Sequence, residues 1–161
     1  MTAAVARAWQ VLAEVMDPEI PVLSVLDLGI VRKVVESDDG RRVEVSVTPT
    51  YSGCPATEVI IADVRATLAT SYDEVEVQVQ LSPPWTTDWM TDAGRGKLRD
   101  YGIAAPNERA LLPVVGEDRP EACPHCGSPQ VEQLAGFGST PCKALWRCTE
   151  CREPFDYFKV H

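Results

Sequence analysis

The sequence predicts an α+β fold, in which a small mixed sheet has helices on one face and is followed by a separate ribbon near the C-terminus. Three observations support this prediction. Apolar residues recur at helical spacing in two segments, β-branched residues alternate in three short segments, and two Cys-x-x-Cys pairs lie in the last 40 residues. The order helix, strand, strand, helix, strand is typical of one sheet covered by its helices.

Each predicted element is short and is bounded by turn or capping residues. The first helix has Thr2 as its N-cap and ends before Pro18, because the residue before a proline avoids helical angles. In the last strand, aliphatic residues alternate and face one way. In chain order, the predicted elements are a helix at 2–16, strands at 30–36 and 42–48, a helix at 55–70, a strand at 75–81 and a short helix at 91–101.

These elements predict three parts along the chain. Residues 1–102 form the α+β domain, residues 103–121 form a linker, and residues 122–161 form the C-terminal domain. The linker contains three prolines and few periodic apolar residues, so we expect it to pack little.

Charge and hydropathy restrict the possible partners. The chain has 15 basic and 24 acidic residues, and its net charge is −9. Residues 122–161 hold four of each sign, so the acidic excess lies in residues 1–121 and disfavours nucleic-acid binding. No run approaches the roughly 18 apolar residues that a membrane span needs, and no secretory signal is recognisable. We therefore expect a cytoplasmic protein without a membrane or nucleic-acid partner.

The four cysteines of the two C-terminal pairs predict a metal site. Cys123 and Cys126 are separated by 21 residues from Cys148 and Cys151. Each pair can form a tight knuckle turn that points two sulfurs at one centre, and a tetrahedral set of four thiolates is typical of structural zinc. We therefore predict a zinc ribbon with a short hairpin between the knuckles. An iron centre or an iron–sulfur cluster is the alternative, since four cysteines also hold those groups.

One more cysteine, Cys142, lies between the two pairs. A buried small side chain is one interpretation of it. The other is a possible extra thiol that exchanges with the four ligands.

Cys54 is the single cysteine of the first domain and lies between a predicted strand and a predicted helix. Amide groups at a helix N-terminus stabilise a thiolate, which makes the sulfur a nucleophile or a metal ligand. Asp17, Glu19 and Asp27 come from turns that can gather at the same end of the sheet. The other interpretation is that Cys54 packs beneath the helix while the acids cap turns, and the residues alone leave both open.

Several catalytic classes lack their motifs. The two histidines, His125 and His161, lie in the first knuckle and at the C-terminus, so Cys54 has no histidine partner in its own domain. The chain has no glycine-rich nucleotide-binding motif and no Glu-x-x-His motif of a di-iron centre.

Longer motifs point to known families. Residues 17–21, 27–29 and 50–55 resemble the small domain of SufT-type iron–sulfur assembly factors. Residues 84–90, 137–148 and 153–159 resemble the D-subunit family of the phenylacetyl-CoA 1,2-epoxidase system, PaaD or PaaJ. Together these resemblances cover nearly the whole chain.

The resemblance implies a non-catalytic accessory subunit in aerobic phenylacetate degradation. Such a subunit assists the assembly or repair of an iron–sulfur or di-iron centre in its partners, which are the oxygenase and reductase subunits. Carried over by position, Cys54 is the transfer or transient metal-binding thiol, holding iron or a cluster briefly, and the four C-terminal cysteines hold the ribbon metal. Two alternatives stay open: a thiol- or metal-dependent enzyme that uses Cys54, and a zinc-ribbon regulator that acts through protein interactions.

Overall fold

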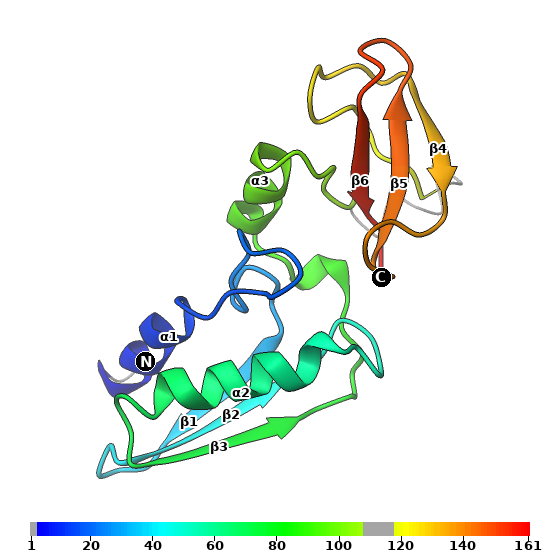
Figure 1. The fold of residues 1–161 in the computed structure, drawn as a ribbon. Helices are drawn as coiled ribbons and strands as arrows, with labels where there is room; N and C mark the ends of the chain where they lie inside the picture. Colours follow the sequence, from blue (N-terminus) through cyan, green and yellow to red (C-terminus); the bar gives the residue numbers. More distant parts are fainter. Residues whose placement is uncertain (1–2, 108–117) are drawn as a thin grey trace. The chain divides into compact units, whose positions relative to one another are not determined.

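The computed structural model describes residues 3–107 and 118–161 (Figure 1). The chain divides into two units, and the boundary along the chain lies between Thr91 and Asp92. The first unit contains a three-stranded mixed sheet. Strand β1 (Val31–Glu36) is antiparallel to β2 (Arg42–Val47), and β2 is parallel to β3 (Glu74–Val79), in the order β1-β2-β3. The β1–β2 turn contains Gly40, whose φ of 67° is a left-handed angle that glycine adopts without strain.

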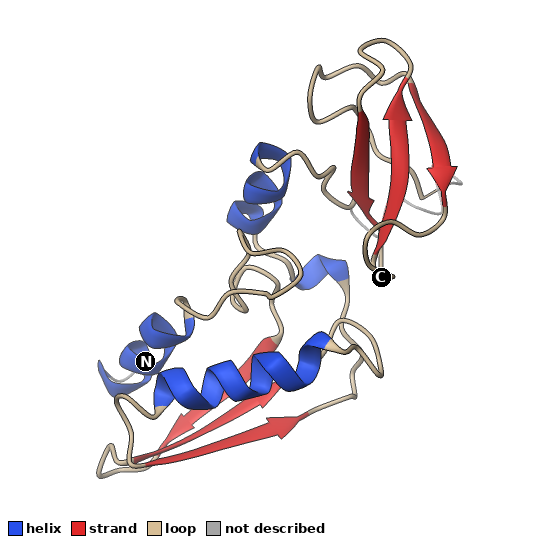
Figure 2. Cartoon of the chain, in the orientation of Figure 1, coloured by secondary structure: helices blue, strands red, loops and turns tan. Residues whose placement is uncertain are grey.

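Both long helices of the first unit cover the same face of this sheet (Figure 2). Helix α1 (Ala3–Leu12) packs on α2 (Ala56–Leu68) and on β1, while α2 also packs on β3. The valines that alternate along β2 are fully buried beneath them, and so are Val64 and Leu68 of α2. The predicted mixed sheet with helices on one face is therefore confirmed.

The first helix is shorter than predicted. It ends at Leu12 rather than at residue 16, because Val15 forms a tight turn with Leu12 and Met16 pairs with Ser24 in an isolated antiparallel bridge. Its predicted cap, Thr2, lies outside the described residues.

The last strand of the first unit also ends early, at Val79. Val77 is buried, whereas Val79 and Leu81 are 46% and 57% exposed. Val47, which pairs with Val79 from the central strand, is buried, so the exposure of Val79 reflects the place of β3 at the edge of the sheet. A 3-10 turn, η1 (Thr87–Trp89), then closes the unit.

The second unit is a helix followed by a ribbon. Helix α3 (Asp92–Asp100) lies within the predicted range, and strands β4 (Val131–Ala135), β5 (Lys143–Cys148) and β6 (Pro154–Phe158) form an antiparallel sheet in that order. The β4–β5 hairpin agrees with the prediction, whereas β6 is an additional strand.

Near its start, the predicted linker pairs with the ribbon. The amide of Ala104 donates to Asp156 and its carbonyl accepts from Phe158, at 2.9 and 3.0 Å, so Ala104 extends the sheet beside β6. Residues 108–117 of this linker lie outside the described residues. The domain boundaries at 102 and 121 stay a prediction. In the structure, α3 belongs to the same unit as the ribbon.

No helix among the described residues combines the length and the apolar content that crossing a bilayer requires.

Candidate functional site

The four cysteines of the ribbon converge on one centre. Their sulfur atoms all lie within 4.8 Å of one another, with 3.8 Å between Cys123 and Cys151 and 3.5 Å between Cys126 and Cys148. Metal–sulfur bonds of about 2.3 Å in a tetrahedron place the sulfurs about 3.8 Å apart. None of these cysteines forms a disulfide. The donor set therefore fits a tetrahedral thiolate-bound metal.

Local backbone geometry positions these sulfurs. The hairpin pairs Val131 with Cys148, which brings the start of β4 and the knuckle before it next to the end of β5. In the first knuckle, the amide of Gly127 donates to the carbonyl of Cys123 at 2.9 Å, and Gly127 has a left-handed φ of 79°. The amide of Cys151 points at the sulfur of Cys148 at 3.5 Å in the second knuckle.

In two of these cysteines, Cys148 and Cys151, the pKa of the thiol is shifted in opposite directions. The amide N–H of Cys151 stabilises the thiolate of Cys148 and lowers its pKa to about 7. The amide N–H of Glu153 acts in the same direction on Cys151, but desolvation and the neighbouring sulfurs outweigh it and raise the pKa of Cys151 to about 12. Adjacent thiolates repel one another, so a bound dication is what allows all four sulfurs to be ionised together.

Metal affinity is accordingly expected to fall as the pH is lowered. Protons compete with the metal for thiolates, so affinity decreases by about tenfold per pH unit for each proton that binding displaces. Metal-dependent stability is lost in the same direction, toward acid. Chelator competition with zinc at several values between pH 6 and pH 8 measures this slope, and a flat profile would contradict thiolate ligation.

Two other side chains of the ribbon lie outside the centre. His125 is exposed, and its ring lies edge-on to Phe155 with centroids 6.4 Å apart. Cys142 is buried just before β5, with the hydroxyl of Thr140 at 3.0 Å from its sulfur. Cys142 and Cys148 are six positions apart along extended chain, which corresponds to about 20 Å. The structure therefore does not bring Cys142 to the four-cysteine centre.

Cys54 occupies the turn between β2 and α2 and is 9% exposed. Its amide donates to Tyr51, its carbonyl accepts from Thr57, and Gly53 before it has a φ of 78°. Because β2 and β3 are parallel, this turn and the segment after β3 lie at the same end of the sheet (Figure 1). Cys54 therefore lies at the end of the sheet where β2 and β3 finish. It is also immediately before the helix, as the sequence predicts.

Two of the three acids proposed to accompany Cys54, Asp17 and Asp27, close their own turns. One oxygen of Asp17 accepts from the amides of Glu19 and Ile20, at 2.8 and 2.7 Å. One oxygen of Asp27 accepts from the amide and the hydroxyl of Ser24, at 2.9 and 3.0 Å. Among the described residues, the only cluster of three or more potential metal ligands is the four-cysteine set. A shared metal site of these acids with Cys54 thus stays a prediction.

Thr48 is a residue near this turn that the sequence did not single out. It directly follows β2 and precedes Pro49, it is 1% exposed, and its hydroxyl has no hydrogen-bond partner among the described residues. An orphaned buried hydroxyl is uncommon in native proteins. A threonine in the last position of the aliphatic strand predicted at 42–48 is the weak signal that could have identified it.

Comparisons with known proteins match each unit separately and the chain as a whole. Residues 6–80 match the family model described as iron-sulfur cluster assembly protein, and residues 110–159 match the PaaD zinc beta ribbon domain. A protein of Escherichia coli (strain K12), provisionally named as the D-subunit of 1,2-phenylacetyl-CoA epoxidase, is 49% identical over 156 residues, which are 94% of this chain and 90% of that protein.

Shorter relatives match the first unit alone. The Fe-S protein maturation auxiliary factor SufT of Staphylococcus aureus (strain USA300) is 39% identical over 79 residues, which are 48% of this chain and 88% of that protein. The crystal structure of a DUF59 domain, a domain of unknown function from Bacillus anthracis, has a TM-score of 0.56 and 29% identity, and the match covers 60% of this chain and 92% of that one.

Proposed function

We propose, from the premise that this chain belongs to the D-subunit family of 1,2-phenylacetyl-CoA epoxidases, that it is an accessory factor for a metal centre of that system in phenylacetate degradation. Its role is to assist the assembly or repair of an iron–sulfur or di-iron centre in the partner oxygenase or reductase subunits. The observation that carries this proposal is the union, in one chain, of an iron–sulfur assembly domain with a four-thiolate ribbon.

The ribbon metal site and Cys54 would have different roles. Four cysteines saturate a tetrahedral metal, so the ribbon metal, which we propose is zinc, has no open position for chemistry and stabilises the fold. Cys54 remains as the thiol that holds iron or a cluster in transit. Its place in the turn between β2 and α2 sets it apart from the four ribbon cysteines, which already share one centre. Because Cys54 is largely buried, loading requires the turn around Gly53 to open.

Replacement of Cys54 by serine tests this role. In a strain that carries the Cys54→Ser variant, the partner subunits are expected to accumulate normally while one of their metal centres is underfilled and epoxidase activity falls. Iron and sulfide analysis of the purified partners measures the deficit. Chemical reconstitution of the underfilled partner is expected to restore its activity.

The matched control is Cys142→Ser, which alters the other buried lone thiol and leaves Cys54 intact. Fully loaded partner centres in the Cys54→Ser strain would refute the proposal. Turnover by the isolated chain without partners would instead favour a thiol-dependent enzyme.

A further inference from the structure

The two edges of the first-unit sheet differ in how they are protected. Natural sheets block exposed edges with bulges, prolines or charged side chains, above all lysine. The β1 edge has a register shift between Val31 and Lys33, and Lys33 is exposed. Along β3, the pairing with β2 is regular from Glu74 to Val79, and the strand contains neither a proline nor a lysine, so its only charged residues are Glu74 and Glu76. Among the described residues, no strand pairs with the outer side of β3.

The outward amides of β3 follow from its hydrogen bonds. Glu74 donates its amide to Arg41 at 3.1 Å, and Gln80 donates its amide to Val47 at 2.8 Å. Successive residues of a strand point their backbone groups to opposite sides, so the even-numbered residues between these two also face β2. The amide and carbonyl groups of the odd-numbered residues, which are Val75, Val77 and Val79, therefore face outward.

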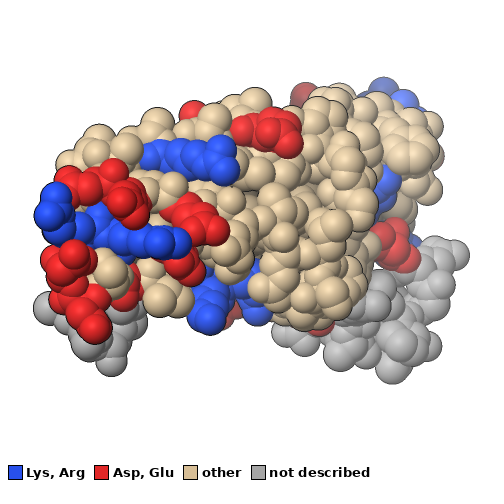
Figure 3. Space-filling model, turned by 90° about the horizontal axis from the view of Figure 1, so that it is seen from below, with Lys and Arg blue, Asp and Glu red and all other residues tan. Residues whose placement is uncertain are grey.

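The side chains along this edge specify what could pair there. On the helix side, Val79 and Leu81 are exposed aliphatic groups. On the open side, Glu74 and Glu76 are exposed. Arg42 bridges Glu76 and Glu44 at 2.7 and 2.8 Å. Figure 3 shows acidic side chains gathered around basic ones at one end of the face seen from below.

We propose that the free edge of β3 binds an extended segment of a partner protein as an additional strand, in which aliphatic residues alternate with lysine or arginine. Opposite charges across a strand pair stabilise it, and like charges destabilise it. A second copy of this chain would set the glutamates of two β3 strands against each other, so the charge pattern selects a different, basic segment.

This inference rests on the proposed function, because it places the partner next to the transfer thiol. The parallel pairing of β2 and β3 puts the end of β3 at the same end of the sheet as the Cys54 turn. A segment docked along β3 would therefore bring its flanking residues to that end. Main-chain pairing supplies affinity in such complexes, and the alternating side chains supply specificity.

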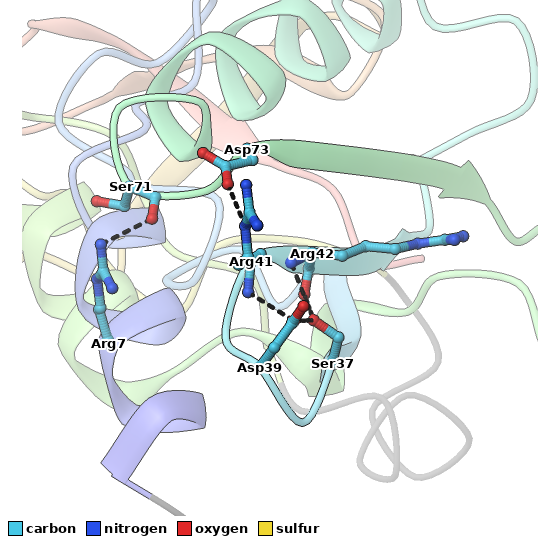
Figure 4. Close-up of polar contacts among 7 residues, drawn as sticks. All are labelled: Arg7, Ser37, Asp39, Arg41, Arg42, Ser71 and Asp73. Atoms are coloured by element: carbon cyan, nitrogen blue, oxygen red, sulfur yellow. Dashed lines mark hydrogen bonds and ion pairs between the residues drawn. The ribbon is translucent and has the colours of Figure 1, made fainter.

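Polar contacts hold the start of β3 in place (Figure 4). The guanidinium of Arg41 pairs with Asp73 at 2.6 Å, and Arg7 of α1 donates to the carbonyl of Ser71 at 2.7 Å. These contacts tie the entry of β3 to the β1–β2 turn and to the first helix. An edge ordered before binding loses less conformational entropy when a strand is added.

A synthetic peptide tests the edge. We would titrate the full chain with a capped peptide of about seven residues that alternates lysine and valine, and follow backbone amides by NMR and hydrogen exchange. The amides of Val75, Val77 and Val79 are expected to exchange quickly in the free chain and to be protected by binding. The same peptide with glutamate in place of lysine is expected to bind at least about tenfold more weakly.

Two sets of variants make the outcome decisive. Val79→Pro removes an outward amide without removing a bond to β2, so it is expected to weaken peptide binding by about tenfold, whereas Val79→Thr retains it. Charge reversal by Glu74→Lys with Glu76→Lys is expected to switch the preference to the glutamate peptide. Unchanged binding by Val79→Pro, protection on β1 instead, or concentration-dependent dimerisation through β3 would each overturn the inference.

The two proposals can fail separately. Normal partner loading with Cys54→Ser, together with retained peptide binding, would refute the transfer role and leave the docking edge standing. Defective loading with Cys54→Ser, together with peptide binding that ignores the β3 variants, would do the reverse.

Discussion

Replacing Cys148 by serine is expected to abolish metal binding and to unfold the ribbon. Cys148 is fully buried and packs in the ribbon core with Cys123, Trp146, Phe155 and Tyr157. That core is small, and structural zinc contributes on the order of 10 kcal/mol to the folding of such modules, which is as much as the whole stability of a typical domain. A three-thiolate remnant leaves the metal with an open position and cannot supply this contribution.

Metal content and the near-ultraviolet circular dichroism of the aromatic side chains, to which buried Trp146 contributes, measure the effect, with Cys142→Ser as the control. Cys142 is buried too, but it lies about 20 Å along β5 from the centre. Its substitution is expected to keep the full metal content and to cost only about 1 to 2 kcal/mol. A Cys148→Ser protein that keeps its metal and its ordered aromatic signals would show that the ribbon folds without the four-thiolate site.

Replacing Gly29 by alanine is expected to destabilise the first unit by about 3 kcal/mol or more. Gly29 has a left-handed φ of 70°, and a Cβ added there would overlap the carbonyl oxygen of Trp89 and lie 2.7 Å from its carbonyl carbon. That backbone has little freedom to move. The indole of Trp85 donates to Leu28 at 2.8 Å, and the amide of Thr91 donates to Asp27 at 2.9 Å.

Urea unfolding of Gly29→Ala and Gly40→Ala separates the clash from the backbone angle. Gly40 has a similar φ of 67°, but a Cβ added there meets nothing within 4 Å. Gly40→Ala is therefore expected to cost only about 1 kcal/mol, the penalty for a left-handed alanine. Equal losses of stability in the two variants would mean that the contact with Trp89 is not rigid.

Local patterns predicted the strands of the first unit closely. The first two strands were expected at 30–36 and 42–48 and are found at Val31–Glu36 and Arg42–Val47. β-Branched alternation and the turn at Gly40 are both short-range signals, so no distant contact was needed to recognise them. Strand β6 was not predicted: it is only five residues long and begins with Pro154, although its alternating aromatic residues favour a strand. It forms because β5 offers it an edge.

For the candidate site residues, too, the sequence left open some questions that the structure answered. Asp17 and Asp27 were expected either near Cys54 or in turns, and the sequence could not choose, because a carboxylate suits both roles. The structure gives each of them amide donors within its own turn. Cys142 looked close to the ribbon ligands in the sequence, but the direction of β5 carries Cys148 away from it.

The sequence alone determined the ligand set of the ribbon, because two Cys-x-x-Cys pairs bring four sulfurs together through local knuckle turns and one hairpin. It also determined which helices and strands make up the first unit, since the spacing of apolar residues is a local property. Tertiary structure alone decided that β3 is an edge strand, which of its amides face outward, and that this edge ends at the same end of the sheet as Cys54. Those features depend on strand order and register, which are set by packing between residues far apart in the chain.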